Sequence, residues 1–447
     1  MSLDNMLKKL SVRSPWLFRI NAGSCNGCDV ELATTACIPR YDVERLGCRY
    51  CGSPRHADIV LITGPLTTRV RDRVLAVWNE IPEPKITVAV GICPISGGVF
   101  REGYSIEGPI SRYIPVDVNV PGCPPRPQAI LEGVVLARKM WLKKLGIECI
   151  WADAEADEDE IQKLFKPNTK AVFGETLANP ALTVFDIEKW ANIAHKNRVP
   201  LIVDNTFATP VLCRPIEWGA DIVIHSTTKY MDGHAVQGGG VIVDGGKFDW
   251  TASGKFPDFT EPDESYHGVV YTRDFGAMAY IIKARMQLMR DFGCYPSAHS
   301  AFLLNMGLET LPVRMKQYCE NARKVAEFLQ SSDKIASVRY PGLPGNEHYE
   351  RAQKYLPLGT SGVMSIDIKG GRTPAMQFMD SLKLACNEVH VADIRTCVLH
   401  PASETHRQLT DEQLVAAGIE PGMVRVSVGL ENVEDIIADL EQALAQI

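Results

Sequence analysis

The sequence predicts an α/β protein with a small parallel-sheet domain, a larger α/β domain and an α+β C-terminal domain. Apolar runs such as 58–64, 85–91 and 201–204 alternate with helix-like segments, a pattern typical of parallel sheets. Several of these runs end in cysteine, aspartate or hydroxyl residues. Because ligand sites on such sheets lie at the carboxyl ends of the strands, both α/β domains are expected to carry a site.

Composition narrows the class of protein. The chain has 447 residues, 45% of them hydrophobic and 23% charged, and its net charge of -7 argues against nucleic acid as a partner. It contains no apolar run of about 18 residues, and residues 1–16 do not resemble a secretory signal, so we expect a cytoplasmic protein without a transmembrane segment. Seven of the 13 cysteines precede residue 124, which favours metal ligation over disulfides.

The first third predicts alternating strands and helices with cysteines at strand ends. The expected strands are 17–24, 58–64, 85–91 and 116–120, and the expected helices are 70–80 and 127–142. Cys25 and Cys28, Cys93, and Cys123 follow three of these strands, among glycines and prolines. Four thiolates at one sheet edge suit a cubane iron–sulfur cluster. Zinc is the alternative metal, and a small buried apolar residue is the alternative role for each cysteine.

Residues about 15–140 resemble the small, cluster-bearing subunit of membrane-bound [NiFe] hydrogenases, which is related to the 20 kDa subunit of respiratory complex I. The motifs that carry the resemblance are CNGCDVE, GSPRHADIVLITGP, GICPISGG and VPGCPPRP. It implies a flavodoxin-like domain with one [4Fe-4S] cluster on Cys25, Cys28, Cys93 and Cys123. It also implies a role in electron transfer beside a large hydrogenase or complex I subunit, at the cytoplasmic face of a membrane complex.

Two features near the cluster motif have open interpretations. Glu31 matches an acidic position beside the cluster in the resembled family, or it is simply a favourable charge at a helix N-terminus. Cys48 and Cys51 depart from the family's pattern. They could bind a second metal, but two ligands alone do not close a site, so we expect structural cysteines.

The junction between the two chemistries has no Gly/Ser/Pro-rich linker. A helix that starts at Gln128 is expected to run to about Leu145 and lead into a strand over 147–150. The sequence 141–148 resembles the second family described below. We therefore expect domains over 1–140, 141–300 and 301–447.

The second part centres on two neighbouring strand ends. The run 201–203 ends in Asp204, and the run 221–224 leads to Ser226, Thr228 and Lys229. Pyridoxal phosphate needs a lysine for covalent attachment, a carboxylate for its pyridine nitrogen, and hydroxyls for its phosphate. Further expected elements are a helical region over 154–164, a strand over 170–173, helices over 184–197, 276–330 and 433–446, and strands over 238–244 and 362–369.

This part resembles the Cys/Met-metabolism branch of fold-type I pyridoxal phosphate enzymes, and within it the O-acetylhomoserine sulfhydrylases. The motifs are ETLANPALTVFDI, PLIVDNTFATPVLCRPIEWGADIVIHSTTK, GGKFDWTASGKFPDFTEPDESYHG, GLETLPVRM, LHPASETH and VRVSVGLENVEDIIADLEQAL. The resemblance implies an enzyme of sulfur amino-acid metabolism that binds pyridoxal phosphate and forms a homo-oligomer. Its substrate is then a small amino acid.

The resemblance also assigns roles to individual residues. Lys229 is expected to bind the cofactor covalently and to move protons, and Arg425 to clamp the substrate carboxylate. The remaining cofactor-binding residues are expected to be Asn179, Asp204, Thr206, Ser226 and Thr228. Plainer roles are a strand-end cap for the hydroxyls, an Asn-Pro turn for Asn179 and a surface position for Arg425. Asp393, His400 and His406 are placed near the site by their motifs, with no chemistry assigned.

The resembled enzymes have a region that this chain lacks. It supplies about a third of the fold, with a glycine-rich phosphate-binding helix and a tyrosine that stacks on the ring. The large domain is therefore expected to be a truncated transferase whose sheet lacks its first strands, and pyridoxal phosphate binding is expected to be weak or absent. Three interpretations remain: a chimera of an intact cluster domain with a truncated transferase, an active bifunctional enzyme, or an inactive structural fusion.

Overall fold

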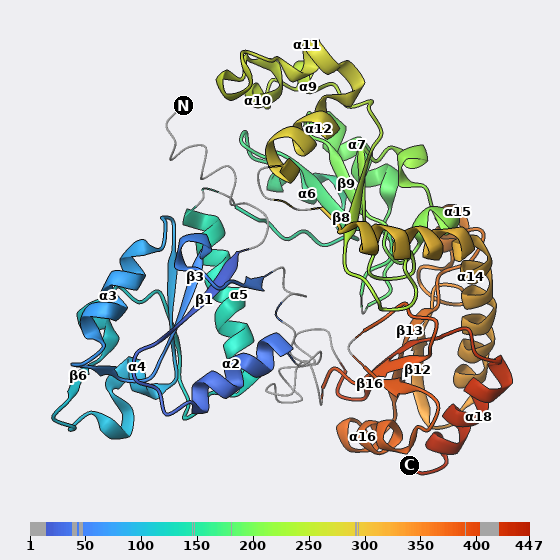
Figure 1. Ribbon diagram of the computed structural model, residues 1–447. Coiled ribbons are helices and arrows are strands. Elements are labelled where there is room, and N and C mark those ends of the chain that lie inside the picture. The colour runs from blue at the N-terminus through green and yellow to red at the C-terminus, as the bar shows by residue number, and fades with distance from the viewer. Residues whose placement is uncertain are drawn as a thin grey trace. The chain divides into compact units, whose positions relative to one another are not determined.

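The computed structural model describes residues 15–37, 43, 48–144, 146, 148–179, 181–290, 293, 295–388, 390–402 and 420–447. These residues form two compact units, one that ends at Ile150 and one that begins at Trp151. Figure 1 shows the first unit in blue to teal and the second in green to red. Each unit has its own sheet and its own hydrophobic clusters.

The first unit is built on a parallel sheet. Its strands in spatial order are β2 (Arg49–Tyr50), β1 (Trp16–Asn21), β3 (Ile59–Thr63), β5 (Ile86–Val90) and β7 (Val118–Val120). Every neighbouring pair is parallel. Among the described strands this order is the 2-1-3-4-5 arrangement of flavodoxin-like folds, which confirms the predicted fold class. β3 and β5 are buried along their whole length, as expected for central strands of a covered parallel sheet.

Helices cover both faces of this sheet (Figure 1). α2 (Gly27–Cys37) and α5 (Pro127–Lys144) pack against side chains such as Leu17 and Val88 on one face. α3 (Arg71–Glu80) packs against Ile20 and Val60 on the other. The unit is completed by α4 (Ile92–Ser96) and by a small ribbon of β4 (Leu66–Thr67) with β6 (Ile106–Gly108).

The end of α5 belongs to the core of the first unit. Trp141 is fully buried there, and its indole N–H donates to the carbonyl of Pro84 at 3.1 Å. Lys144 donates to the carbonyl of Lys85 at 2.8 Å. The described residues that follow, 148–150, are not a strand, so the strand expected over 147–150 is wrong for them. An apolar run reads as a strand, but here these residues pair with no sheet in the described part of the chain.

The second unit begins with a mixed sheet. Its strands in spatial order are β11 (Gly240–Asp244), β10 (Ile222–Ser226), β9 (Leu201–Asp204) and β8 (Val172–Glu175). β8, β9 and β10 are parallel, whereas β11 runs antiparallel to β10. The helices of this region are α6 (Glu158–Leu164), α7 (Ile187–Lys196) and α8 (Thr209–Leu212). Within the described residues this sheet has four strands.

Both outer strands of this sheet expose apolar side chains. Val241, Ile242 and Val243 on β11 are 38%, 37% and 41% exposed, and Phe173 on β8 is 57% exposed. Successive residues of a strand point to opposite faces, so exposure of three in a row means that neither face of β11 is covered by described residues. Edge strands of this kind are normally paired or shielded.

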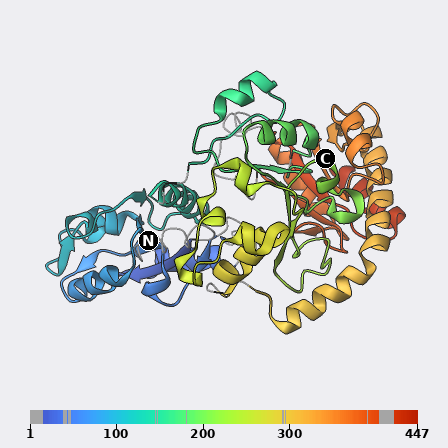
Figure 2. The ribbon, with the colours of Figure 1, turned by 90° about the horizontal axis from the view of Figure 1, so that it is seen from above.

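An aromatic-rich insertion and a long helix follow β11. The insertion contains α9 (Trp250–Ser253), α10 (Pro257–Thr260), α11 (Tyr271–Phe275) and α12 (Ala279–Lys283). Its rings stack, as Trp250 does on Phe259 at 4.5 Å between centroids. α14 (Ala298–Ser331) bends in Figures 1 and 2, and it contains Pro312, which has no backbone N–H to donate within a helix. The helical stretch expected over 276–330 is therefore interrupted before α14.

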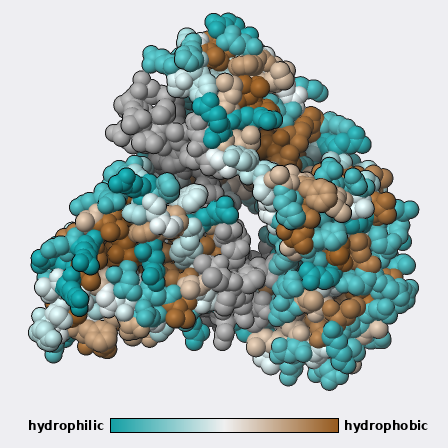
Figure 3. Space-filling model, viewed as in Figure 1, coloured by the Kyte–Doolittle hydropathy of each residue, from teal (hydrophilic) through white to brown (hydrophobic). Residues whose placement is uncertain are grey.

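The C-terminal part is an α+β layer. Its sheet order is β12 (Ile335–Arg339), β13 (Val363–Ile368), β16 (Met423–Ser427), β15 (Cys397–Leu399) and β14 (Cys386–Asn387), and its helices are α15 (Tyr349–Tyr355), α16 (Arg372–Ser381) and α18 (Val433–Leu444). Among the helices described, none is long and apolar enough to cross a membrane. The face in Figure 3 carries abundant hydrophilic residues with smaller hydrophobic patches between them.

Candidate functional site

A chain of hydrogen bonds joins the carboxyl ends of β9 and β10. Asp204 ends β9 and lies opposite Ile224 on the parallel neighbour β10. Its carboxylate accepts from the backbone N–H of Thr206 at 2.9 Å and from the Thr206 hydroxyl at 2.6 Å. That hydroxyl oxygen in turn accepts from the backbone N–H of Ser226 at 2.8 Å. The two strand ends therefore present a carboxylate and hydroxyls at one edge of the sheet.

Lys229 lies in the turn that leaves β10. Its backbone N–H donates to the carbonyl of Ser226 at 3.4 Å, and its carbonyl accepts from Gly233 at 2.8 Å. The Thr228 hydroxyl accepts from the backbone N–H of Gly239 at 3.1 Å. The turn thus brings Lys229 and Thr228 to the same strand end as Ser226, as the sequence predicted for this motif.

Asn179 and Arg425 meet although 246 residues separate them. Arg425 lies on the central strand β16 and is 5% exposed, so it is not the surface arginine of the plainer interpretation. One of its amino groups donates to Oδ1 of Asn179 at 3.3 Å, and the other donates to the carbonyl of His390 at 3.2 Å. A guanidinium fixed in this way can bind a carboxylate with two parallel hydrogen bonds.

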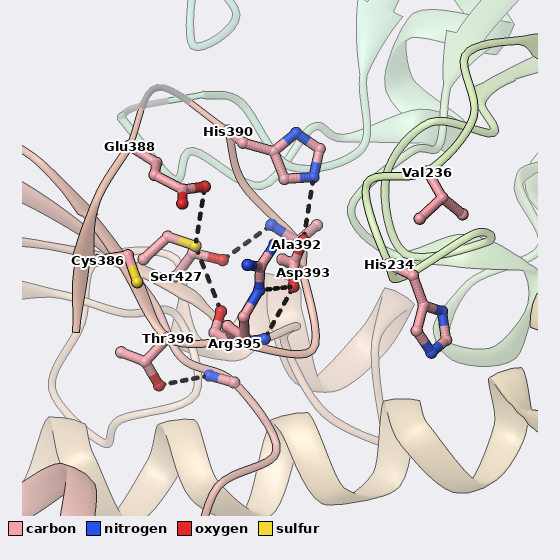
Figure 4. Close-up of polar contacts among 12 residues, drawn as sticks. His234, Val236, Cys386, Glu388, His390, Ala392, Asp393, Arg395, Thr396 and Ser427 are labelled. Carbon is pink, nitrogen blue, oxygen red and sulfur yellow. Dashed lines mark hydrogen bonds and ion pairs between the residues drawn. The ribbon is translucent and has the colours of Figure 1, made fainter. Parts of the chain in front are cut away.

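His390 is a site residue that the sequence did not reveal. Its Nδ1 lies 3.4 Å from Nζ of Lys229, and its Nε2 lies 3.8 Å from Oδ2 of Asp393 (Figure 4). Burial, followed by the charge of Lys229, lowers the pKa of His390 to about 4. The sequence signal, a lone histidine three residues before an aspartate, is too weak to have been distinguished from a core histidine.

The other residues placed here by motif have different fates. His400 is fully buried, and its Nε2 forms a hydrogen bond with the carbonyl of Pro421 at 2.8 Å. This contact gives the side chain a structural role. Asp393 is fully buried behind His390. His406 lies outside the described residues.

The four predicted cluster cysteines converge in the first unit. The pKa of Cys28 is raised to about 11 by burial and, after it, by the charges of Cys93 and Cys25, with a smaller effect of Cys123. Burial, then Cys123 and Cys25, likewise raise the pKa of Cys93. The four thiols therefore lie within electrostatic range of one another. A thiol that is costly to ionise alone is one that a metal must stabilise as thiolate.

Glycines press directly against these sulfurs. A Cβ on Gly91 would lie 2.5 Å from Sγ of Cys28, and one on Gly98 would lie 3.0 Å from Sγ of Cys93. Within the described residues no three cysteine, histidine or acidic side chains are close enough to hold one metal ion. A cubane binds each thiolate through a different iron, so its four ligands stand farther apart than those of a single ion.

The acidic residue buried beside the cluster motif is Asp29 rather than Glu31. Asp29 accepts from Arg19 at 2.8 Å, from Asn21 at 3.2 Å and from the Thr63 hydroxyl at 2.8 Å. It therefore ties the first turn of α2 to β1 and β3. The first turn of α2 contains Asp29, whereas Glu31 lies one residue beyond that turn.

Cys48 and Cys51 pack on different sides of the sheet. Cys48 is fully buried with the cluster of side chains under α5, whereas Cys51 packs with those under α3. The Cys51 thiol donates to the carbonyl of Ser53 at 3.3 Å. The two cysteines therefore belong to separate hydrophobic clusters.

A strand-end lysine beside an aspartate and hydroxyls is the arrangement found in pyridoxal phosphate-dependent enzymes. The donor set fits the cofactor: the Asp204 carboxylate, oriented by Thr206, for the ring nitrogen, an amine, and the hydroxyls of Ser226 and Thr228 for the phosphate. The chain belongs to the Cys/Met metabolism PLP-dependent enzyme family, whose model matches residues 128–445. A second model, that of the 20 Kd subunit of NADH ubiquinone oxidoreductase, matches residues 25–137.

The protein is therefore a fusion of these two families' domains, and the two matched regions meet within a helix. The two matches overlap over residues 128–137, which are part of α5. Both predicted families are confirmed. The four cysteines all lie within or at the start of the 20 Kd subunit match, which is the family for which an iron–sulfur cluster was expected.

Relatives of the second part carry names from sulfur amino-acid metabolism. An O-acetyl-L-homoserine sulfhydrylase of Leptospira meyeri is 44% identical over 313 residues, which are 68% of this chain and 70% of the relative. A homocysteine/cysteine synthase of Saccharomyces cerevisiae is 42% identical over 321 residues, 69% of this chain and 72% of that protein. A crystal structure of a putative O-acetylhomoserine (thiol)-lyase from Campylobacter jejuni has a TM-score of 0.65 and 37% identity. The match covers 70% of this chain and 74% of that one, which carries a pyridoxyl-lysine monophosphate.

Proposed function

We propose that the protein is an electron-transfer domain joined to the lysine-bearing half of an O-acetylhomoserine sulfhydrylase-type site. The observation that carries the proposal for the second unit is the bonded series Asp204–Thr206–Ser226 next to Lys229. For the first unit it is the convergence of Cys25, Cys28, Cys93 and Cys123. Its partner would be a large subunit of the hydrogenase or complex I type, at the cytoplasmic face of a membrane complex.

The side chains of the second unit suggest a division of labour. Bound pyridoxal phosphate supplies an electron sink for the substrate's Cα. The Asp204 carboxylate would hold a proton on the pyridine nitrogen, where the Thr206 hydroxyl keeps it oriented. The Lys229 amine would attach the cofactor and accept or return a proton. Arg425, oriented by Asn179, would bind the carboxylate of an O-acetylhomoserine-like amino acid.

Half of the phosphate-binding residues of the resembled enzymes nevertheless have no counterpart in this chain. The relatives extend well beyond the matched region, since the match covers 70% to 72% of the sulfhydrylase and the synthase. The exposure of the apolar residues on β11 supports the interpretation that this domain lacks neighbouring elements of the family's fold. We therefore favour weak pyridoxal phosphate binding over an active bifunctional enzyme. The retained Lys229, Asp204 and Arg425 support the alternative, an active bifunctional enzyme.

One preparation tests both halves. The purified chain, reconstituted anaerobically with iron and sulfide, should show the broad absorbance of one [4Fe-4S] cluster, and Cys25→Ser should lose it. Added pyridoxal phosphate should give at most a weak lysine-bound absorption band, which Lys229→Ala should abolish. If the parent chain binds no iron and the Cys25→Ser variant behaves in the same way, the proposed cluster is contradicted. A strong band together with turnover of O-acetylhomoserine and sulfide would overturn the truncation argument.

A further inference from the structure

The backbone of the segment between β14 and β15 is held in a constrained conformation. Ala392 has a φ of +66°, a conformation that residues other than glycine rarely adopt. Its backbone N–H donates to the Ser427 hydroxyl at 2.8 Å within the core of the unit. Asp393, the next residue, is fully buried. The backbone is thus held in an uncommon conformation just after His390, as is frequent where a side chain must be aimed.

Arg395 holds the side chain of Asp393 in place. Its Oδ1 accepts from the backbone N–H of Arg395 at 3.0 Å and from Nε at 3.2 Å, and its Oδ2 accepts from Nη2 at 3.3 Å. Hydrogen bonding to Asp393, and then its charge, raise the pKa of Arg395. The other side of the same carboxylate faces Nε2 of His390 at 3.8 Å.

His390 stands between this carboxylate and Lys229, as Figure 4 shows for the aspartate side. Its Nε2 is buried and makes no hydrogen bond with any described residue, while its Nδ1 is 3.4 Å from Nζ of Lys229. The charged groups that face the ring are Lys229, Asp393, Arg425 and Arg395. Because its pKa is lowered to about 4, the ring is neutral at pH 7 and carries one proton.

The electrostatics decide where that proton sits. The Asp393 carboxylate favours a proton on Nε2, which leaves the lone pair of Nδ1 directed at the lysine. We propose that His390 is a positioning residue, in which Nδ1 accepts a hydrogen bond from the Lys229 ammonium and Asp393 sets the tautomer. The inference rests on the proposed function only where it takes Lys229 as the cofactor lysine.

The arrangement has a chemical consequence for Lys229. Its four-carbon stem has many rotamers, and an acceptor fixed by Asp393 selects the one in which the amine points at the site. An acceptor also favours the ammonium over the free amine, because hydrogen bonds to charged groups are stronger. The carbonyl of His390 meanwhile holds Arg425. His390 thereby contacts both side chains, Lys229 through its ring and Arg425 through its carbonyl.

The test uses the cofactor-free full-length chain. Lys229 is acetylated with acetic anhydride across a pH series, and its labelling is quantified by peptide mass spectrometry. His390→Leu should lower the pH midpoint of labelling by about one unit, equivalent to about tenfold more reactive amine at fixed pH. His390→Asn, which restores an acceptor, should return the midpoint toward that of the parent. His234→Leu, at a neighbouring histidine, should leave it unchanged.

A midpoint in His390→Leu equal to that of the parent would overturn the proposal, as would a shift of the same size in His390→Asn. In case neither variant folds, ¹⁵N spectra of the parent chain with labelled histidine decide the question, since the proposal requires a neutral His390 with its proton on Nε2. A proton on Nδ1 contradicts it. None of these measurements needs pyridoxal phosphate, so failure of cofactor binding and failure of this proposal are distinguishable.

Discussion

Arg314 on α14 anchors the turn that carries Lys229, and its removal should destabilise the second unit strongly. The side chain is 6% exposed. It donates to the carbonyls of Tyr230 at 2.7 Å, Met231 at 3.3 Å and Gly307 at 2.7 Å. No carboxylate among the described residues is within ion-pair distance of it. The guanidinium is therefore stabilised by carbonyls of the turn after Lys229 and of its own helix, and its Nε donates to the Thr310 hydroxyl at 3.0 Å.

Arg314→Met keeps the apolar stem and removes the donor from the carbonyls of Tyr230 and Met231, whereas the Gly307 carbonyl still accepts from the Thr310 hydroxyl at 3.3 Å. Each unsatisfied buried group costs about 1–3 kcal/mol, so the expected loss is about 2–4 kcal/mol, because such terms do not add fully. Against a total of about 5–15 kcal/mol, that is a large fraction. The free energy of unfolding is obtained from urea titrations followed by circular dichroism and tryptophan fluorescence.

The matched control is Arg323→Met on the same helix, where the side chain is 64% exposed. It should change the free energy of unfolding by no more than about 0.5 kcal/mol. An Arg314→Met chain that loses less than about 1 kcal/mol would show that water or neighbouring donors satisfy the carbonyls, and would refute the anchoring role.

Two further predictions concern one residue in each unit. Gly91→Ala would place a methyl group 2.5 Å from the Cys28 sulfur at a φ of +93°, so the variant should bind less iron on reconstitution, whereas Gly52→Ala, with open space around it, should bind as the parent does. Burial alone would raise the pKa of Asp439, but hydrogen bonds from three backbone N–H groups outweigh burial and lower it. Its stabilisation is therefore present above about pH 4 and lost as the pH falls through the lowered value. Asp439→Asn should be less stable than the parent by about 1–2 kcal/mol at pH 7, and thermal unfolding should show the difference narrowing below pH 4; a constant difference would contradict the assignment.

The parts of the site that the residue pattern alone predicted are local in the chain, whereas Asn179 and Arg425, 246 residues apart, were placed only by the family resemblance. Lys229 and Ser226 share one turn, and Asp204 and Thr206 are two residues apart, so an apolar run followed by polar residues was enough to place them. The parallel sheet of the first unit followed from the same reasoning, since strand, helix and strand alternate there.

What the sequence did not predict depends on distant contacts. His390 approaches Lys229 across 161 residues, and nothing near it in the chain marks it as more than a core residue. The direction of β11 was also open, because the pattern of a strand contains no information about its partner. The run over 147–150 has strand-like residues, but a strand needs a neighbour, and packing placed Trp141 and α5 in the other unit instead.

The join and the sheet edge together favour the chimera over the bifunctional enzyme. At the join, α5 is packed along its length: Trp141, whose sequence context resembles the second family, is buried in the core of the first unit. At β11 the opposite holds, since three successive apolar residues remain about 40% exposed. A domain that had evolved within this chain would be expected to shield such an edge with charges or a covering element. The first unit thus has a parallel sheet with hydrophobic clusters on both faces, whereas the second keeps the lysine side of its site on a sheet whose outer strands expose apolar side chains. Iron binding should therefore survive changes at Lys229, Asp204 or Arg425.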